Sequence, residues 1–250
     1  NSYKNLLNQK KKLNNNIKFF YKNVSKEKLN FNKLKKIHSK KFSLNDNIFF
    51  SNVSGDKNPI HIDKIFARKT IFGQPIVHGC HLLIYALNIV YKKNKIIGKK
   101  FQVNFLKPVF TNQLLTFYIN ELEDTILIAN KEIIFVKINI EKNQPIPHTN
   151  SDYKKNLRKS KPKKLSIKLI KKNKTYKFVH ACEIKKARNK FPYLYQAYGS
   201  LTASELFDLS YLVGMECPGK HSLFLEANIE LKYQNINPNY KISKYDYRFK

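Results

Sequence analysis

The feature that most restricts the fold is an apolar helix predicted over residues 80–91, CHLLIYALNIVY. Apolar residues occur on nearly every side of this helix, so it must be buried rather than lie on a surface. Gly79 opens the helix, and three runs typical of β-strands follow it, over residues 100–110, 113–123 and 132–141. One buried helix followed by long antiparallel strands predicts an α+β fold in which the sheet wraps around the helix.

Shorter elements are predicted before this helix. Residues 36–43 favour a first strand, and residues 44–54 favour a short helix that ends at Gly55. Ser43 or Asn45 is its candidate N-cap, because either side chain can accept a hydrogen bond from the first turn. A second short helix is predicted in residues 63–71, with Asp63 as its N-cap.

Composition divides the chain into four parts. Residues 1–36 are rich in lysine and asparagine and predict a weakly structured lead-in, whereas residues 37–141 carry the pattern described above. Residues 142–175 have the prolines and charge runs of a basic linker. Residues 176–250 again give a helix and then strand-like runs, the order seen after Gly79, although the residues themselves barely repeat. We interpret them as a second, non-catalytic half that is incomplete.

The net charge of +31 raises the question of nucleic-acid binding. Lysines are spread along the whole chain and arginines are few, whereas a nucleic-acid-binding protein concentrates its basic residues on one face or in a recognition module. The charge therefore indicates a solvated surface and no specific nucleic-acid partner. A positive field would still speed the encounter with an anionic, phosphate-bearing substrate.

Cysteine use and hydropathy indicate a cytoplasmic protein. Cys80, Cys182 and Cys217 are odd in number, far apart and outside any CxxC pattern, which favours a reducing compartment and predicts no zinc site. The longest apolar run, residues 82–90, is about half a membrane span, and no apolar signal core begins the chain. Since the sequence starts without methionine and stops in a strand-like segment, we expect it to be a piece of a longer chain.

The loop VSGDKNPIHID, residues 53–63, holds the residues best suited to catalysis. Asp56 and His61 are five positions apart, and Pro59 stiffens the backbone between them and biases Asn58 away from helix. A bent loop of this kind can bring a carboxylate and an imidazole onto one water molecule. Such a pair can take a proton from water and supply one to a carbon, as reversible hydration requires. The alternative is a turn whose Asp and Asn satisfy backbone groups.

Two blocks of sequence resemble the signature of the MaoC-like, R-specific enoyl-CoA hydratase (hydratase 2) family. The first is FSNVSGDKNPIHIDKIFA, residues 50–67, which matches the pattern Gly-Asp-x-Asn-Pro-aliphatic-His and its later small residue, Ala67. The second, FGQPIVHG at residues 72–79, follows at the right distance. The resemblance covers about residues 40–141 and implies a hot-dog fold, an antiparallel sheet around a central helix. With the second half it implies a double hot-dog.

The resemblance also implies roles for individual residues. Asp56 and His61 would be the catalytic dyad, and Asn58 would hold the water or orient the dyad. The Gly79 N–H would donate to the thioester carbonyl, and a helix N-terminus suits that role because its N–H groups are free and its dipole end is positive. Four further residues would lie near the substrate: Pro75, Val77, His78 and Cys80. For His78 a hydrogen bond at the helix start, and for Cys80 core packing, are the alternatives.

The chain departs from the family pattern at two positions of the central helix. Cys80 stands where methionine is usual, and Leu87 replaces a residue that is often polar. These differences concern the shape of the substrate pocket and leave the dyad intact. The second half lacks the motif, and in double hot-dog relatives such a half often shapes the acyl pocket. Its Cys217 and His221 fit the end of a helix better than a nucleophile pair.

The resemblance implies a lyase of fatty-acid metabolism. Its reaction would be hydration of 2-enoyl thioesters, or dehydration of (R)-3-hydroxyacyl thioesters, carried by CoA or acyl carrier protein, without a metal or redox cofactor. The functional unit would be a homodimer or the internal double hot-dog. One alternative is a catalytically idle scaffold module that binds acyl thioesters, which the intact dyad disfavours. The other is a basic nucleic-acid-binding protein.

Overall fold

The computed structural model of the protein describes residues 33–131, 133–142, 161–163, 175–177, 180–216, 219, 223–231 and 239–241. Nearly all of the predicted lead-in, residues 1–36, and most of the predicted linker, residues 142–175, lie outside this set, as do Cys217 and His221. In the described part of the chain, no helix combines the length and apolarity needed to cross a bilayer.

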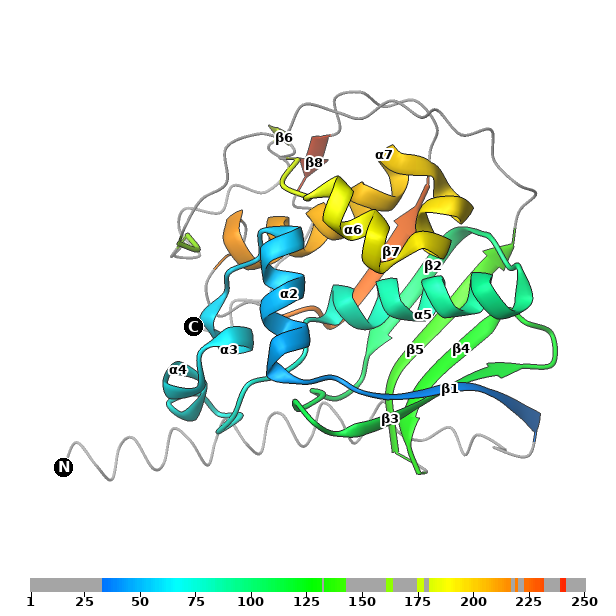
Figure 1. The fold of residues 1–250 in the computed structure, drawn as a ribbon, viewed down its shortest axis with the longest axis horizontal. Helices are drawn as coiled ribbons and strands as arrows, with labels where there is room; N and C mark the ends of the chain where they lie inside the picture. Colours follow the sequence, from blue (N-terminus) through cyan, green and yellow to red (C-terminus); the bar gives the residue numbers. More distant parts are fainter. Residues whose placement is uncertain are drawn as a thin grey trace.

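One antiparallel sheet of six strands forms the main layer (Figure 1). In spatial order its strands are β1 (Leu34–Lys41), β3 (Leu114–Asn120), β4 (Thr125–Asn130), β5 (Ile133–Lys142), β2 (Gly98–Phe105) and β7 (Glu226–Glu230). Alternation along β3 buries Leu115, Phe117 and Ile119 while their neighbours stay partly exposed. The predicted strands are therefore confirmed, including the first one.

Strand β4 is an element that the sequence analysis missed. Its four central residues, Ile126 to Ala129, are all fully buried, so the run TILIAN shows no alternation of apolar and polar residues. A short, continuous apolar run has no period that distinguishes a buried strand from other structure. The sheet consequently has four strands between α5 and residue 142 where three were predicted.

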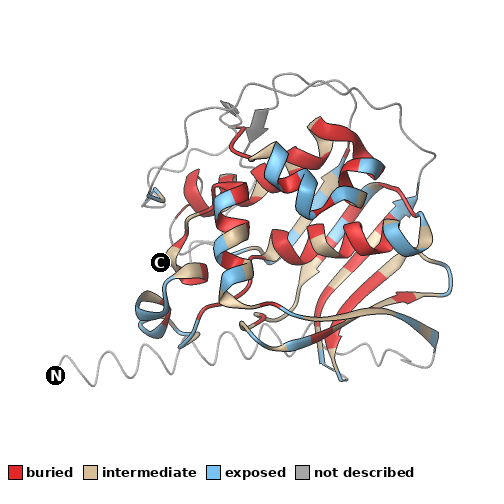
Figure 2. Ribbon diagram, viewed as in Figure 1, coloured by how far each residue is buried: buried red, intermediate tan, exposed pale blue. Residues whose placement is uncertain are grey.

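Helix α5 (Gly79–Asn94) lies against the sheet, as predicted for the buried apolar helix (Figure 1). Leu83, Ile84 and Ala86 have almost no exposed surface, and they belong to the same core cluster as Phe117 of β3 and Val103 of β2. Figure 2 shows this burial continuing from α5 onto the strands. The antiparallel sheet around a central helix is the α+β hot-dog arrangement.

The short elements before α5 place the catalytic loop. Helix α2 (Leu44–Ser54) begins at Ser43, whose side chain accepts from the Asp46 N–H while the Asp46 carboxylate accepts from the Ser43 N–H. The helix ends at Gly55 with a φ of 81°, a left-handed conformation that glycine adopts without steric cost. Helix α4 (Lys64–Arg68) follows, with the Asp63 carboxylate accepting two N–H groups of its first turn. The predicted caps Ser43, Gly55 and Asp63 are thus confirmed.

The second half packs directly onto the first. Helix α7 (Pro192–Tyr211) lies beside α5, helix α6 (Ile184–Lys190) packs on α7, and β7 pairs with β2 to extend the sheet (Figure 1). The Tyr198 hydroxyl accepts from the Gly98 N–H at 3.2 Å, which links α7 to the start of β2. A second central helix and a shared sheet are features expected of a double hot-dog.

The second half supplies less sheet than the first in the described residues. It adds β7 to the six-stranded sheet, and β6 (Thr175–Lys177) pairs only with β8 (Asn239–Lys241). Helix α7 contains Gly199 with non-helical angles, φ 72° and ψ 173°, so two helical segments meet there. After Tyr211 the chain continues into a π-helical turn, η3 (Leu212–Glu216).

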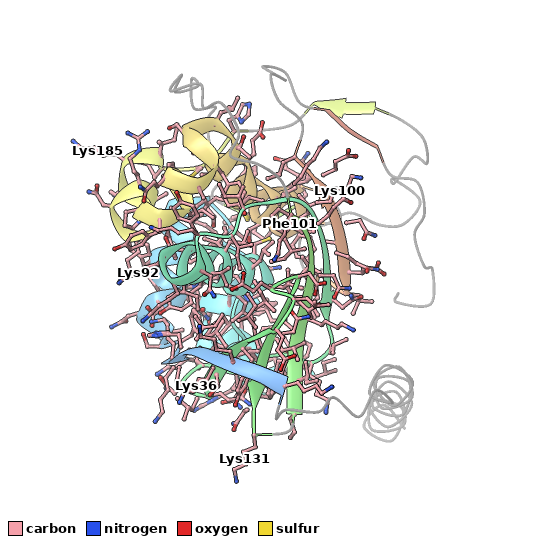
Figure 3. The ribbon with its side chains drawn as sticks, turned by 90° about the vertical axis from the view of Figure 1, so that its right-hand side faces the viewer. Lys36, Lys92, Lys100, Phe101, Lys131 and Lys185 are labelled. Carbon is pink, nitrogen blue, oxygen red and sulfur yellow. The ribbon has the colours of Figure 1, made fainter. Side chains whose placement is uncertain are left out.

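Lysines are distributed over the whole described surface, as the sequence analysis expected. Figure 3 shows Lys36, Lys92, Lys100, Lys131 and Lys185 on different strands, helices and turns and on different sides of the molecule. The ammonium groups of these lysines are therefore far from one another and exposed to solvent, where salt screens their mutual repulsion.

Candidate functional site

The loop after α2 ends in a single helical turn rather than continuing as a loop. This turn, α3 (Pro59–Ile62), carries His61 and begins at Asn58, whose side-chain oxygen accepts from the Ile60 N–H at 3.5 Å. Proline is favoured at the first helical position because its missing N–H has no partner there. The sequence analysis expected the bent loop alone to join Asp56 to His61. The structure achieves this with a bend at Gly55 and a turn at Pro59.

Asp56 is a buried carboxylate with two hydrogen-bond donors. The Ser210 hydroxyl donates to Oδ2 at 2.7 Å, and the Asn58 N–H donates to Oδ1 at 3.1 Å. The side chain is almost fully buried, and this burial raises the pKa of Asp56 because a charged group loses hydration. The His61 ring and the two donors act in the opposite direction, since they favour the charged form.

His61 is held as a neutral ring with one free nitrogen. Its Nδ1 lies 2.9 Å from the carbonyl oxygen of Ile76. Since a carbonyl only accepts, Nδ1–H is the donor, and the lone pair of Nε2 stays available. Burial lowers the pKa of His61 below its usual value, while the nearby Asp56 acts to raise it. A neutral imidazole with a free Nε2 can accept a proton from water.

Asn47 of α2 holds the two segments that carry this arrangement. Its amide nitrogen donates to the carbonyl oxygens of His61 at 2.9 Å and of Ile76 at 3.0 Å. The side chain is completely buried, so it acts as an internal brace between α3 and the segment before α5. The sequence analysis did not identify Asn47, because a single asparagine inside a helix carries no motif.

His78 lies against the dyad. Its ring stacks on that of His61 with 3.8 Å between centroids, and its Nε2 lies 3.4 Å from the Asp56 carbonyl oxygen, which can only accept. The pKa of His78 is well below its usual value, chiefly through burial, so the ring is neutral. His78, at the start of α5, is thus hydrogen-bonded to Asp56 rather than capping the helix with its side chain.

Two polar atoms beside the dyad have no hydrogen-bond partner in the described structure: the amide nitrogen of Asn58 and Nδ1 of His78. A buried polar atom without a partner costs free energy, so the Asn58 donor and the His78 Nδ1 acceptor are each expected to gain a polar partner in the working state. Asn58 lies between Asp56 and His61 in the sequence, and its free amide donor is consistent with the predicted role of holding a water.

One group of three possible metal ligands occurs among the described residues, and it is Asp56, His61 and His78. One ligand-type atom of each lies within 4.8 Å of the others. The His78 nitrogen that faces Asp56 donates a proton to a backbone carbonyl, so it offers no lone pair to an ion. The set therefore suits proton transfer better than metal coordination.

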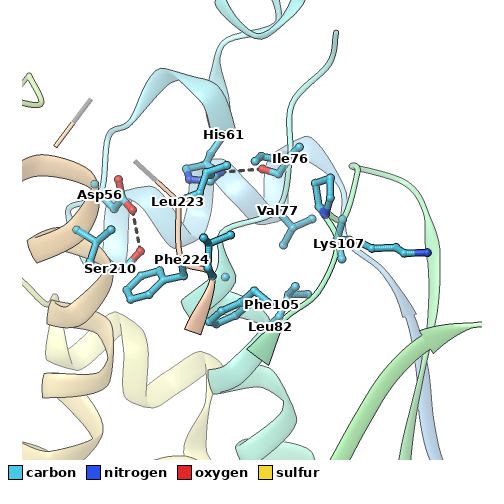
Figure 4. Close-up of a pocket in the computed structure, with 16 residues that line it drawn as sticks. Asp56, His61, Ile76, Val77, Leu82, Phe105, Lys107, Ser210, Leu223 and Phe224 are labelled. Carbon is cyan, nitrogen blue, oxygen red and sulfur yellow. Dashed lines mark hydrogen bonds between the residues drawn. The ribbon is translucent and has the colours of Figure 1, made fainter. Parts of the chain in front are cut away.

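The dyad opens into a pocket at the N-terminus of α5 (Figure 4). Its first-half lining consists of Asp56, His61, Ile76, Val77, Gly79, Leu82, Phe105, Lys107, Pro108 and Val109. Of the predicted residues, Asp56, His61, Gly79 and Val77 thus line one pocket, whereas Asn58, Pro75, His78 and Cys80 do not. Cys80 is packed in the core, as its alternative role required.

Gly79 is required at the helix start by close packing. A Cβ at this position would lie 2.9 Å from the ring of Phe105, closer than side chains tolerate. The His81 and Leu82 N–H groups bond to the His78 carbonyl, whereas the very first N–H groups of a helix have no intrahelical acceptor. Gly79 lines the pocket, so its N–H is the candidate donor for the predicted oxyanion role.

The second half supplies the remaining wall of the pocket. Its lining residues are Ser210, Val213, Gly214, Leu223, Phe224 and Leu225. A Cβ on Gly214 would lie 2.1 Å from Oδ1 of Asp56, so the η3 backbone touches the carboxylate itself. The Met215 sulfur also accepts from the Lys57 N–H at 3.1 Å. π-Helical turns occur often at functional sites. Here the turn brings Gly214 and Met215 of the second half against Asp56 and Lys57 of the first.

The sequence analysis missed Ser210 and Gly214. A serine and a glycine 154 and 158 residues after Asp56 form no local pattern with it. One available signal was Gly214 inside an otherwise helical run, since a glycine there often marks a close approach.

Part of the chain is similar to known proteins. Residues 22–143 match the model of the MaoC like domain. Over 44 residues the chain is 48% identical to the fatty acid synthase subunit beta of Gibberella zeae, a match that covers 18% of this chain and 2% of that protein. Over 48 residues it is 42% identical to the 3-hydroxybutyryl-CoA dehydratase of Methylorubrum extorquens, covering 19% of this chain and 31% of that protein. The chain thus spans less than a third of either relative.

Among solved structures, an (R)-hydratase from A. caviae involved in PHA biosynthesis aligns at 25% identity with a TM-score of 0.38, covering 43% of this chain and 90% of that one. The family match at residues 22–143 includes both sequence blocks, 50–67 and 72–79, on which the predicted resemblance rested. Residues 22–143 are thus similar to the MaoC like domain.

Proposed function

We propose that the protein is a hydro-lyase that interconverts 2-enoyl and (R)-3-hydroxyacyl thioesters of CoA or acyl carrier protein. The observation that carries this proposal is the convergence of Asp56, His61 and the start of α5 on one pocket. Hydration adds and removes only the elements of water, so the proposal calls for no redox cofactor. The fatty acid synthase and dehydratase matches support the same class of reaction.

In the proposed reaction, a water molecule lies between the Asp56 carboxylate and Nε2 of His61. As its oxygen forms a bond to Cβ of the enoyl group, one O–H bond breaks and the dyad takes the proton. The electron pair of the double bond moves toward the thioester, whose oxygen gains negative charge. The dyad then returns a proton to Cα, and its own protonation state is restored. Since the two groups share the water, they titrate as a pair rather than independently.

Gly79 and α5 would stabilise the charge that develops on the thioester oxygen. The first N–H groups of a helix point outward, and the dipole places partial positive charge there. A preorganised donor of this kind contributes about 3 kcal/mol to transition-state stabilisation in comparable sites. General acid–base catalysis by the dyad would add roughly 10²- to 10⁴-fold in rate.

The proposal is tested by following the loss of enoyl absorbance with crotonyl-CoA and with longer 2-enoyl-CoA thioesters. The control is the double variant Asp56→Asn/His61→Ala, which keeps the pocket and lacks both proton-transfer groups. Turnover by the wild-type protein above this control, on at least one chain length, is expected. Binding of the thioesters without such turnover would instead favour the idle binding module, and a steeply salt-dependent affinity for DNA would favour the nucleic-acid alternative.

Replacing Ser210 with alanine is expected to change the pH dependence of the reaction. The Ser210 hydroxyl stabilises the charged form of Asp56, so its removal raises the pKa of that carboxyl further. Asp56 then becomes protonated at a higher pH than in the wild type. The acid limb of the pH profile of kcat/KM therefore shifts to higher pH. At neutral pH we expect kcat/KM to fall about tenfold, the usual size for a lost hydrogen bond to a charged group.

The matched control is Ser204→Ala, which removes a buried hydroxyl from the same helix. Ser204 lies 2.9 Å from the Tyr195 hydroxyl and does not line the pocket. Full pH profiles of kcat/KM for the two variants separate the effects. An unshifted acid limb in Ser210→Ala would show that this hydroxyl does not act on Asp56 during catalysis.

A further inference from the structure

Among the described residues, Lys107 is the one lysine or arginine that lines the pocket. The other lining side chains are apolar except for Asp56, His61 and Ser210. Lys107 follows β2, and its N–H and that of Leu106 both donate to the carbonyl oxygen of Phe135, at 3.3 and 2.8 Å. Two residues further on, the Val109 carbonyl accepts from the Val77 N–H at 2.8 Å. The backbone that carries Lys107 is therefore fixed against both the sheet and the segment before α5.

The ammonium group of Lys107 has no acidic partner within the described parts of the chain. Other lysines of the sheet do have one: Lys100 lies 3.2 Å from Glu141, and Lys142 lies 3.8 Å from Glu123. Lys107 is also only partly exposed. A partly buried cation beside an apolar pocket loses some hydration, so an anion supplied by the ligand would gain from contact with it.

The position of Lys107 fits the carrier end of a thioester. Figure 4 places Asp56 and Lys107 at opposite sides of the pocket, with His61 and Val77 between them. In the proposed reaction Cβ lies at the dyad and the carbonyl carbon lies at Gly79. The bond from the carbonyl carbon to sulfur then leads away from the dyad, toward the Lys107 side. The acyl tail then extends from Cβ in the opposite direction to the carrier.

We propose that Lys107 binds a phosphate group of the thioester carrier. The inference rests on the proposed function, because only a thioester bound with its carbonyl at Gly79 directs the carrier toward this lysine. CoA and acyl carrier protein share one phosphate next to pantetheine, and CoA has further phosphates on its nucleotide. A lysine suits this contact, since its ammonium is a compact charge on a flexible stem that can follow a mobile phosphate.

The test compares crotonyl thioesters of pantetheine, phosphopantetheine and CoA. The first has no phosphate, the second has the shared phosphate, and the third adds the nucleotide phosphates. For Lys107→Gln, the preference in kcat/KM for a phosphorylated substrate over crotonyl-pantetheine is expected to fall about tenfold, the size of one partly exposed hydrogen bond to a charged group. Lys107→Arg, which keeps the charge, should retain most of this preference.

The matched control is Lys36→Gln. Lys36 is an exposed residue of β1, at the opposite edge of the sheet from β7, and it does not line the pocket. This variant loses the same charge, so it removes the same amount from the overall field, and its preference for phosphorylated substrates should stay within about twofold of the wild type.

The three substrates also distinguish the possible outcomes. A loss of preference for both phosphorylated substrates assigns Lys107 to the shared phosphate, and a loss for CoA alone assigns it to the nucleotide phosphates. An unchanged preference in Lys107→Gln, or an equal loss in Lys36→Gln, overturns the proposal. Turnover of crotonyl-pantetheine by the wild-type protein tests the proposed hydratase reaction separately, because that substrate carries no phosphate.

Discussion

Asp56→Asn is expected to lower kcat roughly 10³-fold, within the range that general acid–base catalysis contributes. The asparagine side chain has the same shape, and its oxygen can still accept from the Ser210 hydroxyl or the Asn58 N–H. An amide cannot take up a proton near neutral pH, so the water between residues 56 and 61 loses one of its two acceptors. Binding of substrate should change little, because the apolar walls and the α5 terminus stay intact.

The double variant makes this prediction sharper. If Asp56 and His61 act on one water, removing both should cost little more than removing one, since groups that act as a unit are not additive. The measurement is kcat at saturating crotonyl-CoA for Asp56→Asn, His61→Ala and the combination, with the dissociation constant of the substrate determined separately. Losses that multiply would mean that the two residues work in independent steps.

Asp63→Asn provides the matched control for Asp56→Asn. Asp63 is the exposed N-cap of α4, where asparagine caps as well as aspartate does. The same chemical change only seven residues away should therefore leave kcat within about twofold of the wild type. A comparable loss in both variants would point to a disturbed loop rather than to a lost proton-transfer group.

Gly214→Ala is expected to lower kcat by roughly 10²-fold or more, because a small displacement of a catalytic group has effects of this size. The added methyl would lie 2.1 Å from Oδ1 of Asp56 and 2.5 Å from its carboxyl carbon. These distances are shorter than van der Waals contact and would make the atoms overlap. Either η3 or the carboxylate must therefore move. A displaced carboxylate would lose its position relative to His61 and the hydroxyl of Ser210.

Gly98→Ala is the matched control for this steric change. A Cβ on Gly98 would lie 2.5 Å from the Phe101 ring and 2.6 Å from a methyl group of Ile140, in the core and away from the pocket lining. Both variants should unfold at lower temperature than the wild type, whereas kcat of the folded protein should fall only in Gly214→Ala. Full activity of Gly214→Ala would show that η3 does not hold the carboxylate in place.

The site divides into a part that local sequence predicts and a part that it does not. Asp56, His61 and Gly79 lie within 24 consecutive residues, so the proline, the glycines and the helix start could be placed from the order of residues alone. Ser210 and Gly214 reach the same carboxylate from the second half through tertiary packing. No spacing rule connects residues so far apart, and their contribution became visible only in three dimensions.

The same distinction explains the fold. The buried helix α5 was predicted because a long segment that is apolar on nearly all sides of a helix is stable only when it is removed from water. Strand β4 was missed because a run of four buried residues has no period. The second half was expected from a weak repeat of elements, and among the described residues its strand β7 pairs with the edge of β2.

The pairing of β7 with β2 also covers one edge of the sheet of the first half. A strand at the edge of a sheet presents unpaired backbone groups, which invite pairing with other molecules and aggregation. The five residues of β7 cover this edge from Lys100 to Asn104, and the Leu231 N–H closes it further with a bond to the Lys99 carbonyl. The segment that brings Leu225 and Phe224 to the pocket is thus also a protective cover for the first half. A chain that lost it would expose the edge of the eight-residue strand β2 to pairing with other molecules.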